Sequence, residues 1–185
     1  YFCTSLTSIN FPSTLEVIGD TTFHWCEDLV NVDLNEGLKV IGGYTFNSCY
    51  SLRRINFPST LEEIGDCAFH DCHNLESLDL PNGLEVIGTG AFYNCKSLKR
   101  LFVPSTVKKI EKDAFGLCLK LESVELPEHL EEIGEGAFYG CDELRNVSIP
   151  STVTKLGRIF TLEEELEDGV NYEEQTRPPR HLESL

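Results

Sequence analysis

Residues 67–73 hold the densest group of possible metal ligands in the chain, the pattern C-x2-H-x-C-H formed by Cys67, His70, Cys72 and His73. Thiolates and imidazoles are the ligands that structural zinc prefers, so this spacing could in principle bind zinc. Cys72, however, belongs to a regular series of cysteines that we expect to point into a hydrophobic core. We therefore predict no metal and no cofactor. Cys67 lies outside the series and is the best candidate for an exposed thiol.

Other motifs typical of enzymes are missing from the sequence. It shows no pair of carboxylates arranged for acid–base catalysis, no nucleophile elbow and no phosphate-binding loop. The glycine pairs in Gly88-Thr89-Gly90 and Gly134-Glu135-Gly136 do not begin a GxGxxG motif. We therefore predict that the chain is not an enzyme.

The regular cysteines recur every 23 residues without an insertion: Cys3, Cys26, Cys49, Cys72, Cys95, Cys118 and Cys141. A leucine follows three residues after each of them, and proline, isoleucine, glycine and phenylalanine recur in the same phase. A fixed period of this length is the signature of a solenoid built from stacked coils. Each coil contacts only its neighbours, and the stack offers a long surface for binding.

The repeat can be written C-x2-L-x2-[ILV]-x-[LFV]-P-x2-[LV]-x2-I-G-x2-[AT]-F-x2-C, which resembles the BspA-type leucine-rich repeat over about residues 1–157. The resemblance implies a curved solenoid with a parallel sheet along one face. It also implies ligand binding or adhesion rather than catalysis.

Each coil is expected to contain one short strand and one turn-rich segment. The stretch between leucine and proline alternates apolar and polar residues, as in Leu78-Asp79-Leu80, which predicts a strand with one buried face. Proline ends the strand because it cannot donate a hydrogen bond to the ladder. The stretch between glycine and cysteine predicts a turn with a short 3₁₀ or helical segment on the outer side. The fold class is therefore a leucine-rich repeat solenoid with one short parallel β-strand per coil.

Two kinds of coil alternate, which indicates a longer period of 46 residues. The sequence of residues 9–14, Ile-Asn-Phe-Pro-Ser-Thr, returns unchanged at residues 55–60. The Pro-Ser-Thr part also returns at residues 104–106 and 150–152. We interpret these Ser-Thr pairs as turn chemistry rather than as a functional site.

The repeat loses its phase after Gly157, where the cysteine due at position 164 is replaced by Glu164. We predict a solenoid of about seven coils over 1–157, a partial C-terminal cap over 158–169, and a disordered acidic tail over 170–185. The first coil is incomplete and the chain contains no methionine. We therefore expect this segment to be part of a longer chain.

The chain is strongly acidic, with a formal charge of -16 from 31 acidic and 15 basic residues. This charge argues against nucleic acid and against an anionic membrane surface as partners. No apolar run is long enough to span a bilayer, so we expect no membrane insertion.

The outward side of the predicted strands is the expected binding face. Phe102 stands in a column that otherwise holds polar residues, and an apolar ring within a charged rim has the composition of an interface anchor. Alternatively, the ring simply lies across its neighbours. The candidate partner-binding residues are Arg53, Arg54, Glu76, Asp79, Lys99, Arg100, Phe102, Glu122 and Glu125.

One column of this face alternates in sign: Arg53, Glu76, Lys99, Glu122 and Arg145. Opposite charges on neighbouring strands attract weakly. The plainer interpretation of the column is therefore a solvated ladder of ion pairs.

Taken together, these features favour a non-catalytic interaction or adhesion module that binds a protein or glycan on its sheet face. One alternative is a ligand-free spacer within a larger surface or scaffold protein. Another is a recognition domain attached to an enzyme that lies outside this chain.

Overall fold

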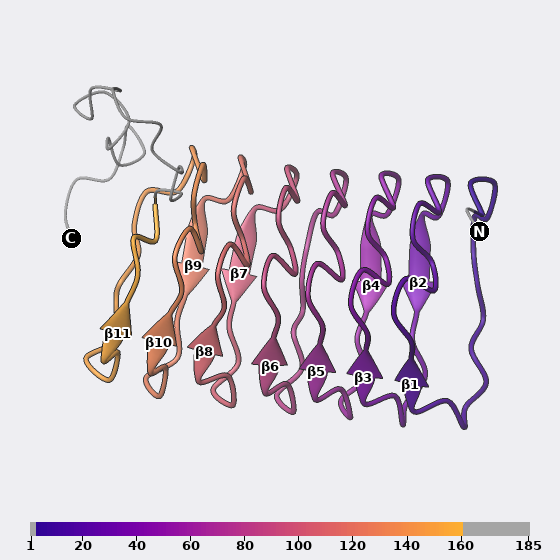
Figure 1. Cartoon of the computed structure of the whole chain (residues 1–185), viewed down its shortest axis with the longest axis horizontal. Coiled ribbons are helices and arrows are strands. Elements are labelled where there is room, and N and C mark those ends of the chain that lie inside the picture. The colour runs from indigo at the N-terminus through magenta and orange to yellow at the C-terminus, as the bar shows by residue number, and fades with distance from the viewer. Residues whose placement is uncertain (1–2, 161–185) are drawn as a thin grey trace, which may run out of the picture.

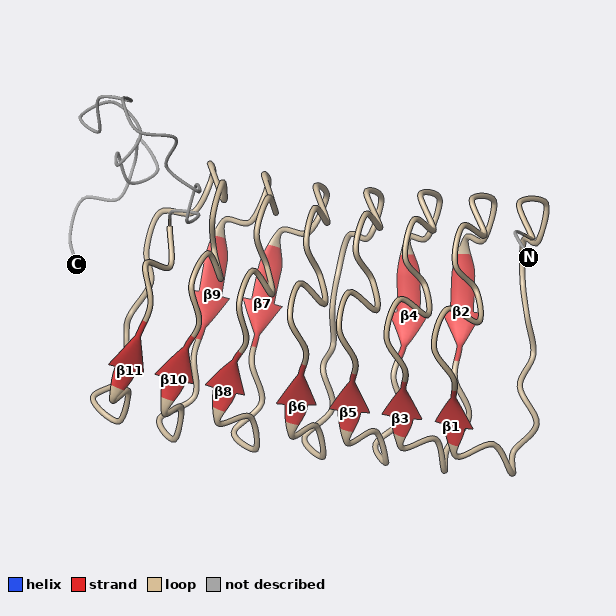
Figure 2. Cartoon of the chain, in the orientation of Figure 1, coloured by secondary structure: helices blue, strands red, loops and turns tan. Residues whose placement is uncertain are grey.

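The computed structural model describes residues 3–160, which form a single row of stacked coils (Figure 1). Each coil contains two runs of chain that travel in opposite directions, as the strand arrows in Figure 2 show. The buried apolar side chains of both runs lie between them and form one core along the row. The predicted solenoid is confirmed.

One run of each coil contributes to a parallel sheet of seven strands, which we call the continuous sheet. Its strands are β1 (Val17–Ile18), β3 (Val40–Ile41), β5 (Glu63–Ile64), β6 (Val86–Ile87), β8 (Lys109–Ile110), β10 (Glu132–Ile133) and β11 (Lys155–Leu156). Equivalent residues of successive coils pair in register, so Val17 faces Val40 and Ile18 faces Ile41. The sequence did not predict this sheet, because a strand of two residues is too short to show alternation.

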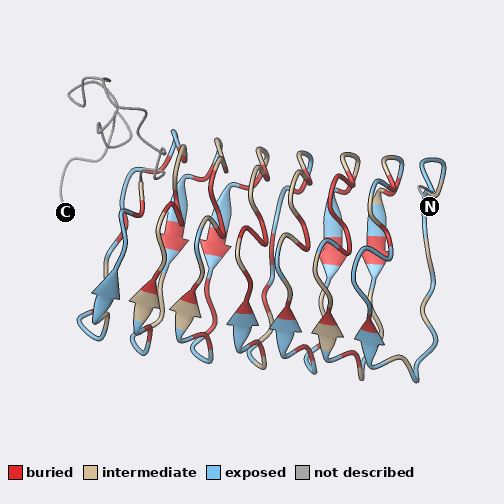
Figure 3. Cartoon of the chain, in the orientation of Figure 1, coloured by how far each residue is buried: buried red, intermediate tan, exposed pale blue. Residues whose placement is uncertain are grey.

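The other run forms what we call the interrupted face. It contains β2 (Asn31–Asp33) paired with β4 (Arg54–Asn56), and β7 (Arg100–Phe102) paired with β9 (Ser123–Glu125). These strands lie where the sequence predicts them, and in each the middle residue is buried between two exposed ones (Figure 3). In the coil between β4 and β7 the predicted strand is reduced to a bridge from Leu78 to Leu101.

The segments between glycine and cysteine are successive turns. No helix occurs in residues 3–160, so the helical part of the prediction is not confirmed. Each of these turns has two positions in the left-handed backbone region, with φ between 52° and 63° where the residue is not glycine. A right-handed helix cannot accommodate such residues. Gly90, Asn94 and Gly136 occupy these positions and were the signal in the sequence.

The turns place a phenylalanine from each coil at the centre of the core. The rings of Phe23, Phe46, Phe69, Phe92, Phe115 and Phe138 stack with centroids 5.2–6.0 Å apart and planes within 13° of parallel. Stacking of this kind adds to the gain from burying the rings.

The regular cysteines form a second column beside the rings. From Cys49 to Cys141 each thiol is buried and donates to the carbonyl of the phenylalanine in the preceding coil, over 3.2–3.4 Å. All of these cysteines are free thiols. The predicted buried cysteine ladder is thus confirmed from Cys26 to Cys141 but was wrong for Cys3, which is exposed in the first coil. The S–H hydrogen bonds explain why a donor suits this position.

The glycine that follows each strand of the continuous sheet lets successive coils approach closely. A Cβ atom added at Gly65 would lie 2.7 Å from the backbone nitrogen of Gly43, and one at Gly88 would lie 2.6 Å from that of Asp66. Where Glu111 replaces the glycine, pairing between β6 and β8 is reduced to Ile87 and Ile110. The glycine column therefore sets the spacing of the coils.

The 46-residue period has a structural basis in the Ser-Thr pairs. Thr60 Oγ1 donates to the carbonyl of Leu38 over 2.8 Å, and Thr152 Oγ1 donates to that of Leu130 over 2.7 Å. Thr106 makes the same bond to Leu84. Each threonine therefore connects its coil to the preceding coil, which gives the Ser-Thr pairs a structural role between coils.

The regular hydrogen bonding ends at the last described coil. Phe138 N donates to the carbonyl of Ile159, whereas Phe115 N donates to Ala137, so the offset shortens from 22 residues to 21. This agrees with the loss of phase after Gly157. Residues 161–169 of the predicted cap and the predicted tail over 170–185 lie outside the described residues. Within the described part, no helix could cross a membrane.

Candidate functional site

The structure places all nine predicted partner-binding residues on the interrupted face, and all nine are exposed. Arg54 lies in β4, Arg100 and Phe102 lie in β7, and Glu125 lies in β9. The remaining five flank these strands or the Leu78 bridge: Arg53, Glu76, Asp79, Lys99 and Glu122. Alternation along each strand gives this grouping, because the intervening residues such as Ile55 and Leu101 are buried in the core.

Phe102 is the most exposed large apolar residue on this face, with 56% of its surface accessible to solvent. Its backbone position is fixed, since β7 pairs with β9 in a register that sets Phe102 opposite Glu125. Among the described residues its ring has no aromatic partner, unlike the stacked core rings. An exposed ring on a fixed strand is therefore available for contact.

The column of alternating charge lies on the same face. Backbone bonds place its members in successive coils, with Glu76 N donating to Arg53 O and Glu122 N donating to Lys99 O. Within residues 3–160 no ion pair of 4.0 Å or less involves these side chains. The predicted ion-pair ladder was therefore wrong for this column.

Ion-pair ladders form instead along the continuous sheet. Lys109 Nζ lies 3.2 Å from Glu132 Oε1, and Lys155 Nζ lies 3.4 Å from Glu132 Oε2. The pKa of Lys109 is raised, first by Glu111, whose Oε2 lies 3.1 Å from its Nζ, and then by Glu132, while the hydrogen bond from Lys109 lowers the pKa of Glu132. The unbroken register of β8, β10 and β11 brings these side chains into reach of one another.

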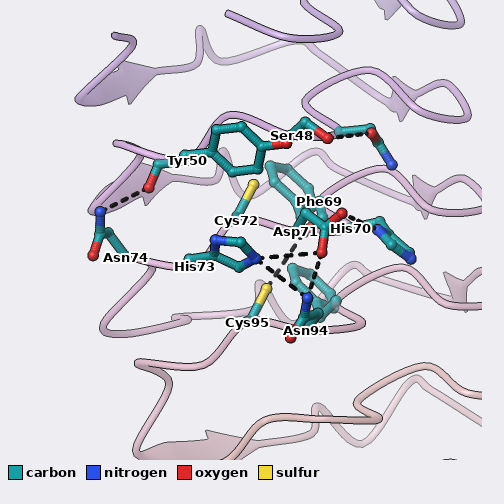
Figure 4. A network of polar contacts seen from close by, with 12 residues as sticks. Ser48, Tyr50, Phe69, His70, Asp71, Cys72, His73, Asn74, Asn94 and Cys95 are labelled. Carbon is teal, nitrogen blue, oxygen red and sulfur yellow. Dashed lines mark hydrogen bonds and ion pairs between the residues drawn. The ribbon is translucent and has the colours of Figure 1, made fainter. Parts of the chain in front are cut away.

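Of the four residues that resembled a zinc site, the two histidines belong to a polar network around Asp71 (Figure 4). Asp71 lies 3.2 Å from His70 Nδ1 and 3.4 Å from His73 Nε2, and it accepts a hydrogen bond from Asn94. The imidazole of His70 stacks on Tyr93, with ring centroids 5.0 Å apart. The network holds two successive turns together.

Cys72 points away from this network. Its thiol is buried and donates to the carbonyl of Phe46 over 3.2 Å, as the cysteine ladder requires. Over residues 3–160 no group of three or more histidine, cysteine, aspartate or glutamate residues is arranged to hold a metal ion.

Cys67 is half-buried, so the prediction of an exposed thiol was wrong for this residue, and Cys3 is the exposed cysteine. Burial raises the pKa of Cys67, and its hydrogen bond with Tyr44 acts in the opposite direction. A raised pKa means less thiolate at neutral pH and therefore lower reactivity.

Comparison with known proteins agrees with this geometry. The family model described as BspA type Leucine rich repeat region matches in six copies over residues 1–122 and 108–161. The chain belongs to the BspA-type leucine-rich repeat family. Proteins with such leucine-rich repeats are generally interaction or adhesion modules and are generally not enzymes. No match was found among functionally curated proteins.

Solved structures of other bacterial proteins have the same architecture. The leucine-rich repeat protein TpLRR of T. pallidum is 33% identical with a TM-score of 0.73, over 82% of this chain and 69% of that one. A leucine-rich cell surface protein of Faecalibacterium prausnitzii is 29% identical with a TM-score of 0.79, over 84% of this chain and 45% of that one. The chain thus spans less than half the length of the second protein. The pneumococcal vaccine antigen PcpA, 23% identical with a TM-score of 0.54 over 85% of this chain and 36% of that one, shares the fold.

Proposed function

We propose that this chain is a non-catalytic module that binds a protein or glycan partner on its interrupted face. The observation that carries the proposal is Phe102, an apolar ring held in an exposed position at the centre of a polar surface. Buried aromatic anchors surrounded by charged residues dominate the binding energy of many interfaces.

The rim around Phe102 would supply specificity. Arg100 in the same strand and Glu125 in the paired strand are both exposed, and neither forms an ion pair in the described part of the chain. Charges without an intramolecular partner can pair with a ligand and steer its approach. Because both signs are present, the partner should carry both signs or be a polar glycan, and the overall charge of -16 argues against a polyanion such as nucleic acid.

The family supports an adhesive role. The related structure from Faecalibacterium prausnitzii is described as a leucine-rich cell surface protein. We extend that description to this chain only as part of the proposal, in which the solenoid presents its interrupted face to a partner outside the molecule.

The proposal is tested by capture followed by measurement of affinity. The wild-type chain and the Phe102→Ala/Arg100→Glu variant serve as baits, and a partner held only by the wild type is identified and purified. Titration calorimetry with that partner should then show a loss of about tenfold to thirtyfold in affinity for Phe102→Ala alone, as for other anchor residues.

A matched control is Val86→Ala, which removes an exposed apolar side chain, 45% accessible, from the continuous sheet instead. It should leave the affinity unchanged. Circular dichroism of every bait checks that folding is intact. Equal retention of all partners by both baits would favour the alternative of a ligand-free spacer and would leave Phe102 as a surface residue without a binding role.

A further inference from the structure

The outer surface of the continuous sheet carries an ordered pattern of charge. The two residues at the start of each strand, one just before it and one within it, are exposed or half-buried, whereas the second strand residue of β1 to β10 is buried. From β1 to β11 these positions are negative, positive, doubly negative, negative, doubly positive, doubly negative and positive. The charged residues are, in order, Glu16; Lys39; Glu62 and Glu63; Glu85; Lys108 and Lys109; Glu131 and Glu132; and Lys155.

This pattern is complementary to its own reverse, with β6 at the centre. When the order of the coils is reversed, the double negative charge of β5 faces the double positive charge of β8. The positive charge beside β3 faces the double negative charge of β10, and the negative charge beside β1 faces the positive charge of β11. Only β6 faces itself, and it presents the exposed apolar Val86 together with Glu85.

The isolated chain leaves the central part of this pattern unbalanced. Glu62 and Glu85 lie in successive coils, because Glu85 N donates to Glu62 O over 2.9 Å. Like charges on neighbouring strands are destabilising. In the described residues no ion pair involves Glu62, Glu63 or Lys108. These are the charges that the reversed arrangement would bring together.

We propose that the continuous sheet binds a second copy of this chain, face to face and with the order of the coils reversed. The twofold axis would run parallel to the strands past Val86, as the self-complementary interface of a symmetric dimer requires. If the two copies instead packed with their coils in the same order, every charged residue would face the same residue of the other copy. A shift of the axis by half a coil in either direction would set several like charges against each other.

The interface would be small. Seven strands about 4.8 Å apart give a strip about 29 Å long, and its width is that of short strands. The buried area would fall below that of a standard stable interface, so the dimer should be weak and sensitive to salt. This inference does not depend on the proposed function, because the interrupted face lies on the opposite run of each coil.

The test uses two charge-inverted variants of the whole chain, Lys108→Glu/Lys109→Glu and Glu62→Lys/Glu63→Lys, with folding checked by circular dichroism. Each variant alone would bring like charges together at β5 and β8, and its dimer dissociation constant should rise at least about tenfold. An equimolar mixture of the two restores opposite charges at both places. Sedimentation equilibrium should therefore show wild-type dimers, monomeric single variants and a one-to-one heterodimer in the mixture.

Two further variants complete the test: one measures the orientation of the two copies, and the other is the control. Val86→Cys should be joined to the same position of the second copy by a short thiol-specific cross-linker, with the linked peptide identified by mass spectrometry. Arg53→Glu/Arg54→Glu on the interrupted face should leave the dimer intact. Wild-type monomers at low salt, single variants that dimerise as well as the wild type, or a mixture that stays monomeric would each overturn the proposal.

Discussion

Phe92 and Phe102 lie in two regions of the molecule, one packed between coils and the other exposed to solvent. Phe92 lies in the turn column, is fully buried, and stacks between Phe69 and Phe115. Phe102 lies on the interrupted face, is 56% exposed, and replaces a polar residue. The same residue type therefore has a structural role in one region and is available for binding in the other.

The difference shows where the repeat has to be regular. In the turn column every coil touches the next through the same side chain, so phenylalanine and cysteine recur in each one. On the interrupted face the side chains point outward, and the column that contains Phe102 runs Asn10, Asp33, Asn56, Asp79, Phe102, Glu125 and Ser148. Residues that are the same in every coil lie at contacts between coils. Residues that vary lie on the surface, where a function can differ from coil to coil.

The largest expected effect comes from raising the pH, which acts on the buried thiols of the turn column. Burial raises the pKa of Cys49 and Cys141 from 9.0 to about 12, and raises those of Cys72, Cys95 and Cys118 as well. Below pH 9 these thiols are neutral in both the folded and the unfolded chain. Between pH 9 and about 12 only the unfolded chain releases their protons, so stability falls as the pH rises.

Each buried thiol should lower the free energy of unfolding by up to about 1.4 kcal/mol per pH unit in this range. Urea unfolding at a series of pH values from about 8 to about 11 measures the slope. Cys95→Ala removes one thiol and should reduce the slope by up to about 1.4 kcal/mol per unit. A slope that is the same in this variant would contradict the assignment to the thiols.

The next effect compares the two phenylalanines directly. Phe92→Ala removes a ring that is packed on both sides and should lower the free energy of unfolding by about 3–5 kcal/mol. Phe102→Ala should change it by no more than about 0.5 kcal/mol, as for other exposed residues. Urea unfolding of both variants gives the comparison. Similar losses in the two would show that Phe102 is a packing residue, and the proposed binding role would lose its basis.

A smaller effect is expected at the glycines of the continuous sheet. Gly65→Ala would place a Cβ atom 2.7 Å from the backbone of the preceding coil, which should cost about 1–3 kcal/mol. Gly19 lies in the same column, but a Cβ atom there would meet only Thr22 Oγ1 at 3.8 Å. Gly19→Ala should therefore be neutral or stabilise by up to about 1 kcal/mol. Equal losses in denaturant melts would mean that the glycines act through backbone entropy rather than through coil spacing.

Much of the fold was predictable because the repeat is phased without insertions. The period gave the solenoid, the cysteine ladder and the buried phenylalanines, all of which depend only on which residues recur. The continuous sheet was missed, because its outward positions hold Val17, Glu63 and Lys109 in turn and its strands show no alternation. The helical segment is not confirmed, because Gly90 and Gly136 have left-handed backbone, which a right-handed helix does not contain.

The candidate site was predictable only as a surface. Alternation along β7 placed Arg100 and Phe102 outward, as observed. The geometry of charged side chains was not predictable, because an ion pair depends on rotamers and on strand pairing that no single coil encodes. Alternating charge therefore gives no ion pairs on the interrupted face, while the ion pairs around Glu132 on the continuous sheet were not predicted.

The smallest expected effect tests whether pairs of coils are the unit of the repeat. Deleting residues 73–118 removes two coils and joins a coil with a Ser-Thr pair to one without it, as in the intact chain. Deleting residues 73–95 removes one coil, joins two of the same kind and sets Arg53 beside Lys99. One exposed like-charge contact is worth about 1 kcal/mol or less, so the single deletion should cost up to about 1 kcal/mol more per coil removed. Urea melts of the two deletions measure this difference, and equal losses per coil would mean that the 46-residue period records only how the sequence duplicated.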